Sequence, residues 1–371
     1  MVTRAFRVST SLPQMCCAVV VVLLLTSNLS TTTTNSSPSS SILNPQMGDS
    51  CTIFTVSIGD RVYFGNNEDY RLWGINAWFV PAQTISTLAG DSSIYGAVFF
   101  GFDDNDDPAD GYPQGGMNDQ GLCMDGNGLS YYSLNPHPER LNQQWALLAE
   151  VLWVCATVDE VEAWFLTHNI GSTMNYQLHF ADATGDAVVI SAGPDQELAF
   201  TQIGVDTCLV STNINVADPT RDVFDCWRYS TAMAMLTVMH SASDLTVEAC
   251  RDVLAAVHQD GTYATKYSNV FDCVSHDIYL WYDRDYTQAA VMNLDSELAA
   301  VIPGATGYYE EDPLFGAFDL DGNICYRKVA ITELFATSVP SPPLQLIFFV
   351  VGAIVGIVAI STVILYLRKR R

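Results

Sequence analysis

The uncharged stretch Leu346–Leu367 is the feature that most limits how this chain can fold. As a helix its 22 residues would be about 33 Å long, enough to cross the hydrocarbon core of a bilayer. The basic residues 368–371 follow directly, and such a tail stays in the cytoplasm. Near the start, arginines precede the short apolar run Ala18–Leu25, as in a secretory signal peptide. We therefore expect a signal peptide (1–26), a transmembrane helix (346–367), and an ectodomain that is extracellular or lumenal.

Two low-complexity segments separate the expected ectodomain from these ends. Residues 27–50 form a Ser/Thr/Asn-rich leader or propeptide, and residues 338–345 form a Pro-rich spacer, which leaves 51–337 as the folded domain. Gly352 and Gly356 have the GxxxG spacing of some membrane-helix dimers. A homo-oligomer is therefore one interpretation, although glycines are common in such helices.

The ectodomain is strongly acidic. Between Cys51 and Pro343 the chain has 40 acidic and 10 basic residues. Such a surface repels polyanions, so we expect no binding to nucleic acid. The acidic strings 103–110 and 319–323 lack the bidentate glutamate that completes an EF-hand, so we interpret them as solvated loops.

Ten cysteines occur, of which Cys16 and Cys17 fall in the signal segment and eight in the ectodomain. An oxidising compartment would allow up to four disulfides among the eight, but the spacing leaves their pairing open. The sequence has no CxxC pair, HExxH motif or close histidine cluster. It therefore predicts neither a metal site nor a cofactor.

Apolar periodicity predicts strands and helices in separate blocks. The strands are expected at Cys51–Ile58, Arg61–Phe64, Tyr95–Phe100, Met117–Met124, Tyr176–Phe180, Ala187–Ser191, Leu198–Ile203, Cys208–Ser211, Val270–Cys273, Ile278–Tyr282 and Ala289–Leu294. The helices are expected at Leu141–Cys155, Val161–His168, Trp227–His240 and Leu245–His258, the second opened by a capping box at Thr157–Glu160. This order favours segregated layers over alternating βαβ units.

The first predicted hairpin joins a cysteine to an acidic string. Cys51 starts one strand, and the return strand runs into Gly65-Asn66-Asn67-Glu68-Asp69, which would bring an acidic side chain beside the thiol. A thiol with a pKa of about 8.5 is mostly protonated at neutral pH. An α-amine with a pKa of about 7.7–8.0 on the same residue could accept that proton. Only scission of the Ser50–Cys51 bond would create this amine; the alternative is that Cys51 is half of a disulfide.

Two further motifs carry amide side chains. The string Gly116-Met117-Asn118-Asp119-Gln120-Gly121-Leu122 precedes Asn127, whose amide could donate to an oxyanion. Asn213 follows a predicted strand, and Arg228 follows Cys226-Trp227 at a predicted helix start. The alternatives are an ordinary turn for the first motif, and a turn-capping asparagine and a surface arginine for the second.

Together these motifs resemble the choloylglycine hydrolase and penicillin V acylase group, the linear-amide hydrolases of the N-terminal-nucleophile superfamily. The resemblance covers Cys51 to about Leu298. It implies an α+β fold, a four-layer αββα sandwich of two mostly antiparallel sheets. It also implies that the first cysteine becomes the N-terminal nucleophile. By position, Asp69, Asn127, Asn213 and Arg228 would be the other catalytic residues, with the exact register of Asn127 open by one residue.

One departure concerns the substrate. The resembling enzymes usually have arginine where Asn66 stands, which puts a bile-acid substrate in doubt. Asn66, Trp73 and Trp78 are candidate substrate-binding residues, although both tryptophans could equally be core residues. We expect an amidase acting on a small N-acyl amide at a non-peptide C–N bond. The alternative is a catalytically inactive, membrane-tethered binding or adhesion ectodomain that retains the fold.

Overall fold

The computed structural model describes residues 51–71, 74–87, 90–102, 113–142, 147–204, 207–219, 226–301 and 324–336. The chain divides into Met1–Pro45 and Gln46–Arg371, and every described residue belongs to the second unit. The predicted signal peptide, leader, spacer, transmembrane helix and cytoplasmic tail all lie outside the described residues. Within the described ranges, no helix has the length and apolar character needed to cross a membrane.

The first large sheet contains the predicted hairpin, and each of its strands is antiparallel to its neighbours. Its order is β14 (Cys208–Ser211), β1 (Thr52–Ile58), β2 (Arg61–Asp69), β15 (Thr265–Asp272), β16 (Asp277–Tyr282) and β17 (Asp285–Asn293). Gly59 has φ of +69° in the turn between β1 and β2, a conformation that glycine adopts without steric cost. The predicted strands of this region are confirmed, with β2 extending through the acidic string.

The second large sheet is also antiparallel throughout. Its order is β13 (Leu198–Gln202), β12 (Ala187–Ala192), β11 (Thr173–Ala181), β8 (Cys123–Ser133), β7 (Pro113–Asn118), β6 (Ala97–Phe102), β3 (Ile75–Val80) and β18 (Arg327–Ala330). Two small sheets pair β4 (Gln83–Thr87) with β5 (Gly90–Ile94) and β9 (Leu141–Asn142) with β10 (His168–Asn169). The prediction of one strand over Met117–Met124 is wrong, because a turn separates β7 from β8 there.

The two large sheets pack face to face. Phe64 of the first sheet and Phe79 and Phe100 of the second belong to one buried core. Burying a side chain of this size contributes about 1.5–3 kcal/mol relative to leaving it in water. Strand alternation sends neighbouring residues to the outer faces, where helices cover them.

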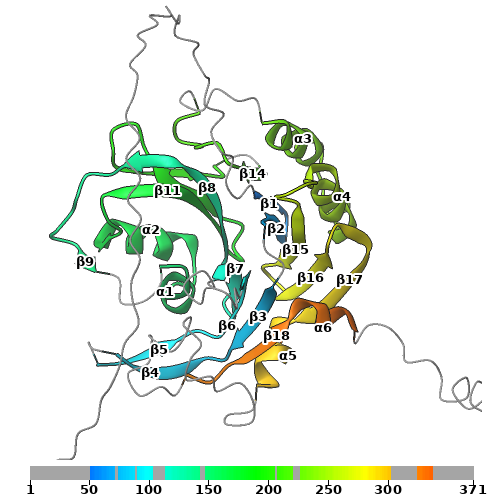
Figure 1. Ribbon diagram of the computed structural model, residues 1–371, viewed down its shortest axis with the longest axis horizontal. Coiled ribbons are helices and arrows are strands. Elements are labelled where there is room, and N and C mark those ends of the chain that lie inside the picture. Colours follow the sequence, from blue (N-terminus) through cyan, green and yellow to red (C-terminus); the bar gives the residue numbers. More distant parts are fainter. Residues whose placement is uncertain are drawn as a thin grey trace, which may run out of the picture. The chain divides into compact units, whose positions relative to one another are not determined.

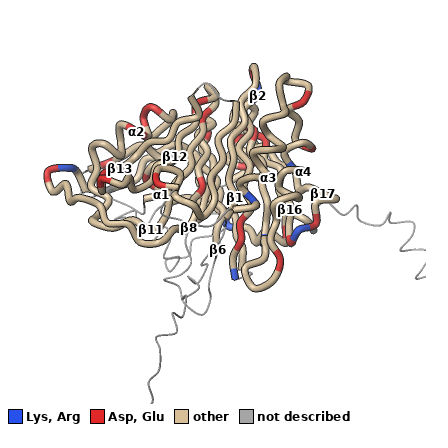
Figure 2. Tube along the Cα trace, turned by 90° about the horizontal axis from the view of Figure 1, so that it is seen from above, with Lys and Arg blue, Asp and Glu red and all other residues tan. Residues whose placement is uncertain are grey.

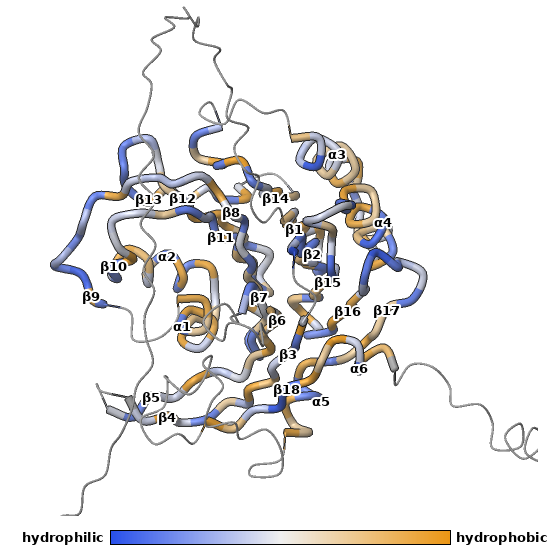
Figure 3. Tube along the Cα trace, in the orientation of Figure 1, coloured by the Kyte–Doolittle hydropathy of each residue, from blue (hydrophilic) through white to orange (hydrophobic). Residues whose placement is uncertain are grey.

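Helices cover both outer faces, so the layers run α, β, β, α as the resemblance implied (Figure 1). The second sheet is covered by α1 (Leu147–Val154) and α2 (Val158–Thr167), and Figure 3 shows α1 hydrophobic along most of its length. The first sheet is covered by α3 (Trp227–Leu236) and α4 (Val247–Val257). Two short helices, α5 (Leu294–Ala299) and α6 (Ile331–Ala336), complete the described elements.

Several predicted helix boundaries need correction. The helix predicted from Val161 begins three residues earlier, at Val158. Residues 141–142 form β9, so the helix predicted from Leu141 begins at Leu147. The helix predicted to reach His240 ends at Leu236, four residues earlier. The capping residue of α2 is confirmed, since the Thr157 side chain accepts a hydrogen bond from the Glu160 N–H at 3.3 Å.

The eight cysteines in the described residues are all free thiols in this structure, so none of the disulfides that an oxidising compartment would allow among them is formed. Cys123 at the start of β8 and Cys273 after β15 place their sulfur atoms 3.5 Å apart in the core between the sheets. Acidic residues outnumber basic ones along the described chain, as Figure 2 shows.

The Gly-Met-Asn-Asp motif ends β7 and enters the turn toward β8, and its asparagine is structural. The Asn118 side-chain nitrogen donates to the carbonyls of Leu152 and Cys155, each at 2.8 Å. Its side-chain oxygen accepts from the N–H groups of Gln120 and Leu122, at 3.1 and 3.0 Å. One buried amide therefore fastens the end of α1 to the second sheet.

We expect Asn118→Ala to lower the free energy of unfolding by about 2–4 kcal/mol, because it leaves buried backbone groups without partners. Urea denaturation of the purified chain measures this change. The exposed Asn142 on β9 provides a matched control, and Asn142→Ala should stay within about 0.5 kcal/mol of the wild type. Equal effects of the two substitutions would show that Asn118 does not fasten α1.

Candidate active site

The β1–β2 register brings Cys51 and Glu68 together. Thr52 pairs with Asn67, so Cys51 and Glu68 are the next residues toward the open end of the hairpin. The Cys51 Sγ donates to Glu68 Oε1 at 3.3 Å. Both residues are buried, with 3% and 1% of their surface exposed. The acidic partner of the thiol is thus Glu68, and alternation along β2 turns Asp69 to the other face.

A second carboxyl group is linked to this pair through an amide. Asn66 Nδ2 donates to Asp125 Oδ2 at 2.7 Å and lies 3.5 Å from Glu68 Oε2. Asp125 comes from β8, so the contact joins the two sheets at the site. The Asn66 Oδ1 and the hydroxyl of Tyr267 are buried and have no hydrogen-bond partner among the residues that the structure describes. Unpaired polar atoms are uncommon in a protein core, so these two indicate that the space beside the thiol is polar.

Arg228 holds the backbone around the cysteine. From the first turn of α3 its Nη1 donates to the carbonyl of Cys51 at 2.8 Å and to Thr52 Oγ1 at 2.9 Å. Its Nη2 donates to Asn213 Oδ1 at 2.8 Å. The guanidinium also lies 3.7 Å from Asp69 Oδ2. With only 4% of its surface exposed, this arginine is a buried part of the site.

The two candidate amides reach the Cys51 backbone in different ways, Asn127 directly and Asn213 through Arg228. Asn127 Nδ2 donates to the Cys51 carbonyl at 3.1 Å, the oxygen that Arg228 also contacts. Asn213 Nδ2 donates to the Gly128 carbonyl at 2.8 Å. Gln177 of β11 lies 3.5 Å from Asn127 Oδ1 and donates to the backbone before and after Asn213. Both amides are therefore oriented by fixed partners.

Asp69 is held in a network on the face of β2 opposite Glu68. Its Oδ1 accepts from the Thr265 hydroxyl, and Gln259 Nε2 donates to its Oδ2 at 2.7 Å. Together with Arg228, these contacts compensate part of the cost of burying the carboxylate.

Burial and the three carboxyl groups shift several pKa values. Burial, followed by the charges of Glu68, Asp69 and Asp125, raises the pKa of the Cys51 thiol well above its ordinary value, while the Asp69 N–H lowers it. Burial and the Asp125 charge likewise raise the pKa of Glu68. Burial also raises the pKa values of Asp69 and Asp125, each to about 7. With these raised pKa values the acidic groups of the site lose their protons less readily, and the Cys51 thiol stays neutral.

The structure brings together most of the predicted site residues. Cys51, Asp69, Asn127, Asn213, Arg228 and Asn66 are joined by the contacts above. Trp78 instead packs in the core under α1 and α2, with 1% of its surface exposed, because alternation along β3 turns it away from the first sheet. Trp73 lies outside the described residues.

Sequence reasoning missed Glu68 as the thiol's partner, and it missed Asp125 and Gln177. Glu68 could have been found, since a two-residue turn at Gly59-Asp60 pairs position 51 with position 68. Asp125 and Gln177 reach the site only through the packing of the second sheet on the first, which no local pattern reveals.

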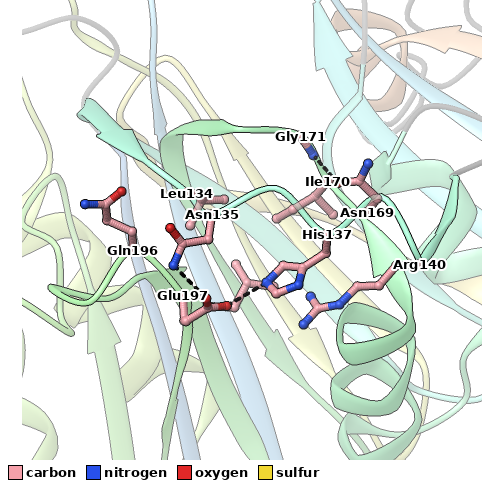
Figure 4. Close-up of a pocket in the computed structure, with 10 residues that line it drawn as sticks. Leu134, Asn135, His137, Arg140, Asn169, Ile170, Gly171, Gln196 and Glu197 are labelled. Atoms are coloured by element: carbon pink, nitrogen blue, oxygen red, sulfur yellow. Dashed lines mark hydrogen bonds and ion pairs between the residues drawn. The ribbon is translucent and has the colours of Figure 1, made fainter.

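A small hollow lined by residues from 134–140, 169–171 and 196–198 shares no residue with the cysteine site. Figure 4 shows the Glu197 carboxylate between Asn135 and His137, and it accepts hydrogen bonds from both at 2.7 Å. The Glu197 and Glu139 carboxylates raise the pKa of His137. Across the described residues, no group of three or more His, Cys, Asp or Glu side chains is arranged to hold a metal ion.

No protein-family model matches the chain, and no curated protein matches it. Similar solved structures include two variants of conjugated bile acid hydrolase from Clostridium perfringens. They are 15% and 16% identical, with TM-scores of 0.47 and 0.48, and each match covers 67% of this chain and 93% of theirs. Penicillin V acylase from Agrobacterium tumefaciens is 16% identical with a TM-score of 0.48, over 65% of this chain and 84% of its own. These are the enzyme groups that the motifs resemble.

Replacing Arg228 with methionine should lower the free energy of unfolding by about 3–5 kcal/mol, because the Asp69 carboxylate would stay buried without its cation. Urea denaturation at pH 8, where Asp69 is ionised, measures the change. The exposed pair of Arg251 and Asp252, 2.7 Å apart, provides the control. Arg251→Met should cost less than about 1 kcal/mol. A similar loss for both variants would contradict the role assigned to Arg228.

Proposed function

We propose that this protein is a membrane-anchored amidase that cleaves a linear, non-peptide C–N bond of a small N-acyl amide. The observation that carries the proposal is a network of residues far apart in sequence around Cys51. Asn127 and Arg228 donate to the Cys51 carbonyl, and Arg228 also contacts Asp69 and Asn213. A cysteine that was only a structural thiol would not require this set of charged and amide groups. The motif resemblance independently supports the same four residues.

The proposed nucleophile is the Cys51 sulfur, activated after scission of the Ser50–Cys51 bond. The liberated α-amine takes the thiol proton as the sulfur attacks the amide carbonyl, and it returns that proton to the departing amine. The acyl group then remains on the sulfur as a thioester. A water molecule, deprotonated by the same α-amine, hydrolyses the thioester and releases the acid.

The other residues would stabilise charge. Asn213, with Asn127, would donate to the oxyanion of the tetrahedral intermediate, a contribution of about 10²–10³ in rate for one donor. Asp69 would hold the α-ammonium in register. Arg228 would supply the positive potential that this acidic site needs, and its hydrogen bonds to the Cys51 carbonyl and to Asn213 support that role.

The proposed location follows from the ends of the sequence. A signal peptide would direct 51–337 across a membrane, and the apolar segment 346–367 would retain it there with the basic tail in the cytoplasm. The substrate would then be met on the extracellular or lumenal side. No contact of the chain with nucleic acid is proposed, because its charge is of the wrong sign.

We expect the mature ectodomain to begin at Cys51 and Cys51→Ala to abolish amide hydrolysis. The N-terminal mass tests the first expectation, and amine released from a panel of N-acyl amino acids, fatty-acid amides and β-lactam side-chain amides tests the second.

Cys250→Ala, which removes a buried thiol in α4, should retain wild-type hydrolysis. An intact Ser50–Cys51 bond in a chain without hydrolytic activity would favour the binding ectodomain. Hydrolysis that survives Cys51→Ala would disprove the proposed mechanism.

A further inference from the structure

Scission of the Ser50–Cys51 bond raises a chemical problem that hydrolysis of the substrate does not. Before the bond is cut, the Cys51 nitrogen is an amide and has no basic lone pair. The α-amine that would later accept the thiol proton does not yet exist. Another group must therefore take the proton when the thiol attacks the preceding carbonyl.

Glu68 is positioned to be that group. Its Oε1 lies 3.3 Å from the Cys51 Sγ, and in the described part of the chain it is the one carboxylate that accepts a hydrogen bond from this thiol. The contact is set by strand register, since the two residues face each other across the β1–β2 hairpin. Asn66 fixes the other oxygen of the carboxyl group at 3.5 Å. The buried histidine is not an alternative, because His179 is held by Thr55 and Ser211.

Electrostatics favours a local transfer over loss of the proton to water. Moving a proton from Cys51 to the ionised Glu68 exchanges a carboxylate for a thiolate and leaves the total charge unchanged. Loss of the proton to solvent would instead add another buried negative charge beside Asp69 and Asp125. Burying such an uncompensated charge costs several kcal/mol.

We propose that Glu68 is the proton acceptor and donor for self-cleavage of the chain at Ser50–Cys51; this inference rests on the proposed function, which requires that cleavage. The Cys51 sulfur forms a bond to the Ser50 carbonyl carbon while Glu68 takes the thiol proton. The bond from that carbon to the Cys51 nitrogen breaks, and Glu68 returns the proton to the nitrogen as it leaves. Water then hydrolyses the thioester, which releases the carboxylate of Ser50 and restores the thiol.

The test measures cleavage of full-length Glu68→Gln by the mass of its N-terminus over time. We expect cleavage at least 100-fold slower than in the wild type, because general acid–base groups contribute about 10²–10⁴ in rate. Glu68→Asp should restore part of the rate. Glu150→Gln removes another buried glutamate, in α1, and should be cut like the wild type. Cleavage of Glu68→Gln at the wild-type rate would overturn the proposal, as would a wild-type chain that is never cut.

The pH profile of cleavage distinguishes a proton-accepting role of Glu68 from a purely structural role. It is measured on chains that retain Glu68, so it does not depend on whether Glu68→Gln folds. The titratable groups that act on Glu68 are the Cys51 thiol just before β1, Asp125 from β8, Tyr267 from β15, and Asp69, the next residue on its own strand. As the acceptor it must be ionised, so the wild-type rate should rise with pH. Asp125→Asn removes a charge that raises the pKa of Glu68, so the midpoint of the profile should move to lower pH. A flat profile, or an unmoved midpoint, would overturn the proposal.

Amine release from the substrate panel is scored separately. A chain that is cut with the expected dependence on Glu68, yet hydrolyses no amide, would contradict the proposed amidase while supporting the role of Glu68. A Glu68→Gln chain that is cut rapidly and hydrolyses amides normally would support the proposed amidase and contradict the role of Glu68.

Discussion

The site depends on the register of one hairpin. A two-residue turn at Gly59-Asp60 fixes every pair along β1 and β2, so the residue before β1 must lie opposite Glu68. Because side chains alternate, the same register turns Cys51, Asn66 and Glu68 toward the second sheet and Thr52 and Asp69 toward α3. A slip of one residue would exchange these two sets. The chemistry of the thiol is therefore decided by the turn at the far end of the hairpin.

This register creates an electrostatic problem that the surrounding layers solve only in part. Glu68 and Asp125 approach each other from different sheets, and Asn66 bridges them with a neutral amide. A cation at position 66 would have compensated both charges, whereas asparagine brings none. The compensating cation here is Arg228, which reaches the site from a helix layer and contacts Asp69. Burial is the main reason why the pKa values of Glu68 and Asp125 are raised, and for Glu68 the charge of Asp125 adds to the effect of burial.

Much of the fold could be predicted from local sequence patterns, whereas only some residues of the site could be predicted in this way. Strands of alternating apolar residues and the Thr157 cap are local features, and they were predictable. Residue 118 shows the limit, because the resemblance of its motif to the linear-amide hydrolases does not reveal that its side chain fastens α1. Trp78 shows a second limit, because its strand is buried on both faces and the sequence does not say which face a tryptophan occupies. Asp125 required knowledge of how two sheets pack, which depends on contacts between residues distant in sequence.

The excess of negative charge around Cys51 gives a reason why this site would suit a cysteine with a free α-amine. In the uncut chain the Cys51 nitrogen is neutral, the Arg228 guanidinium lies 3.7 Å from Asp69, and the charges of Glu68, Asp69 and Asp125 all act on the thiol. Scission would add an ammonium group within a few ångströms of these carboxyl groups, and an opposite charge at that distance favours the ionised form of an acid. The acids would then lose protons more readily, and the ammonium would be held where the mechanism needs it. On this argument the precursor is the less favourable state electrostatically, so cleavage and completion of the site are driven by the same charges.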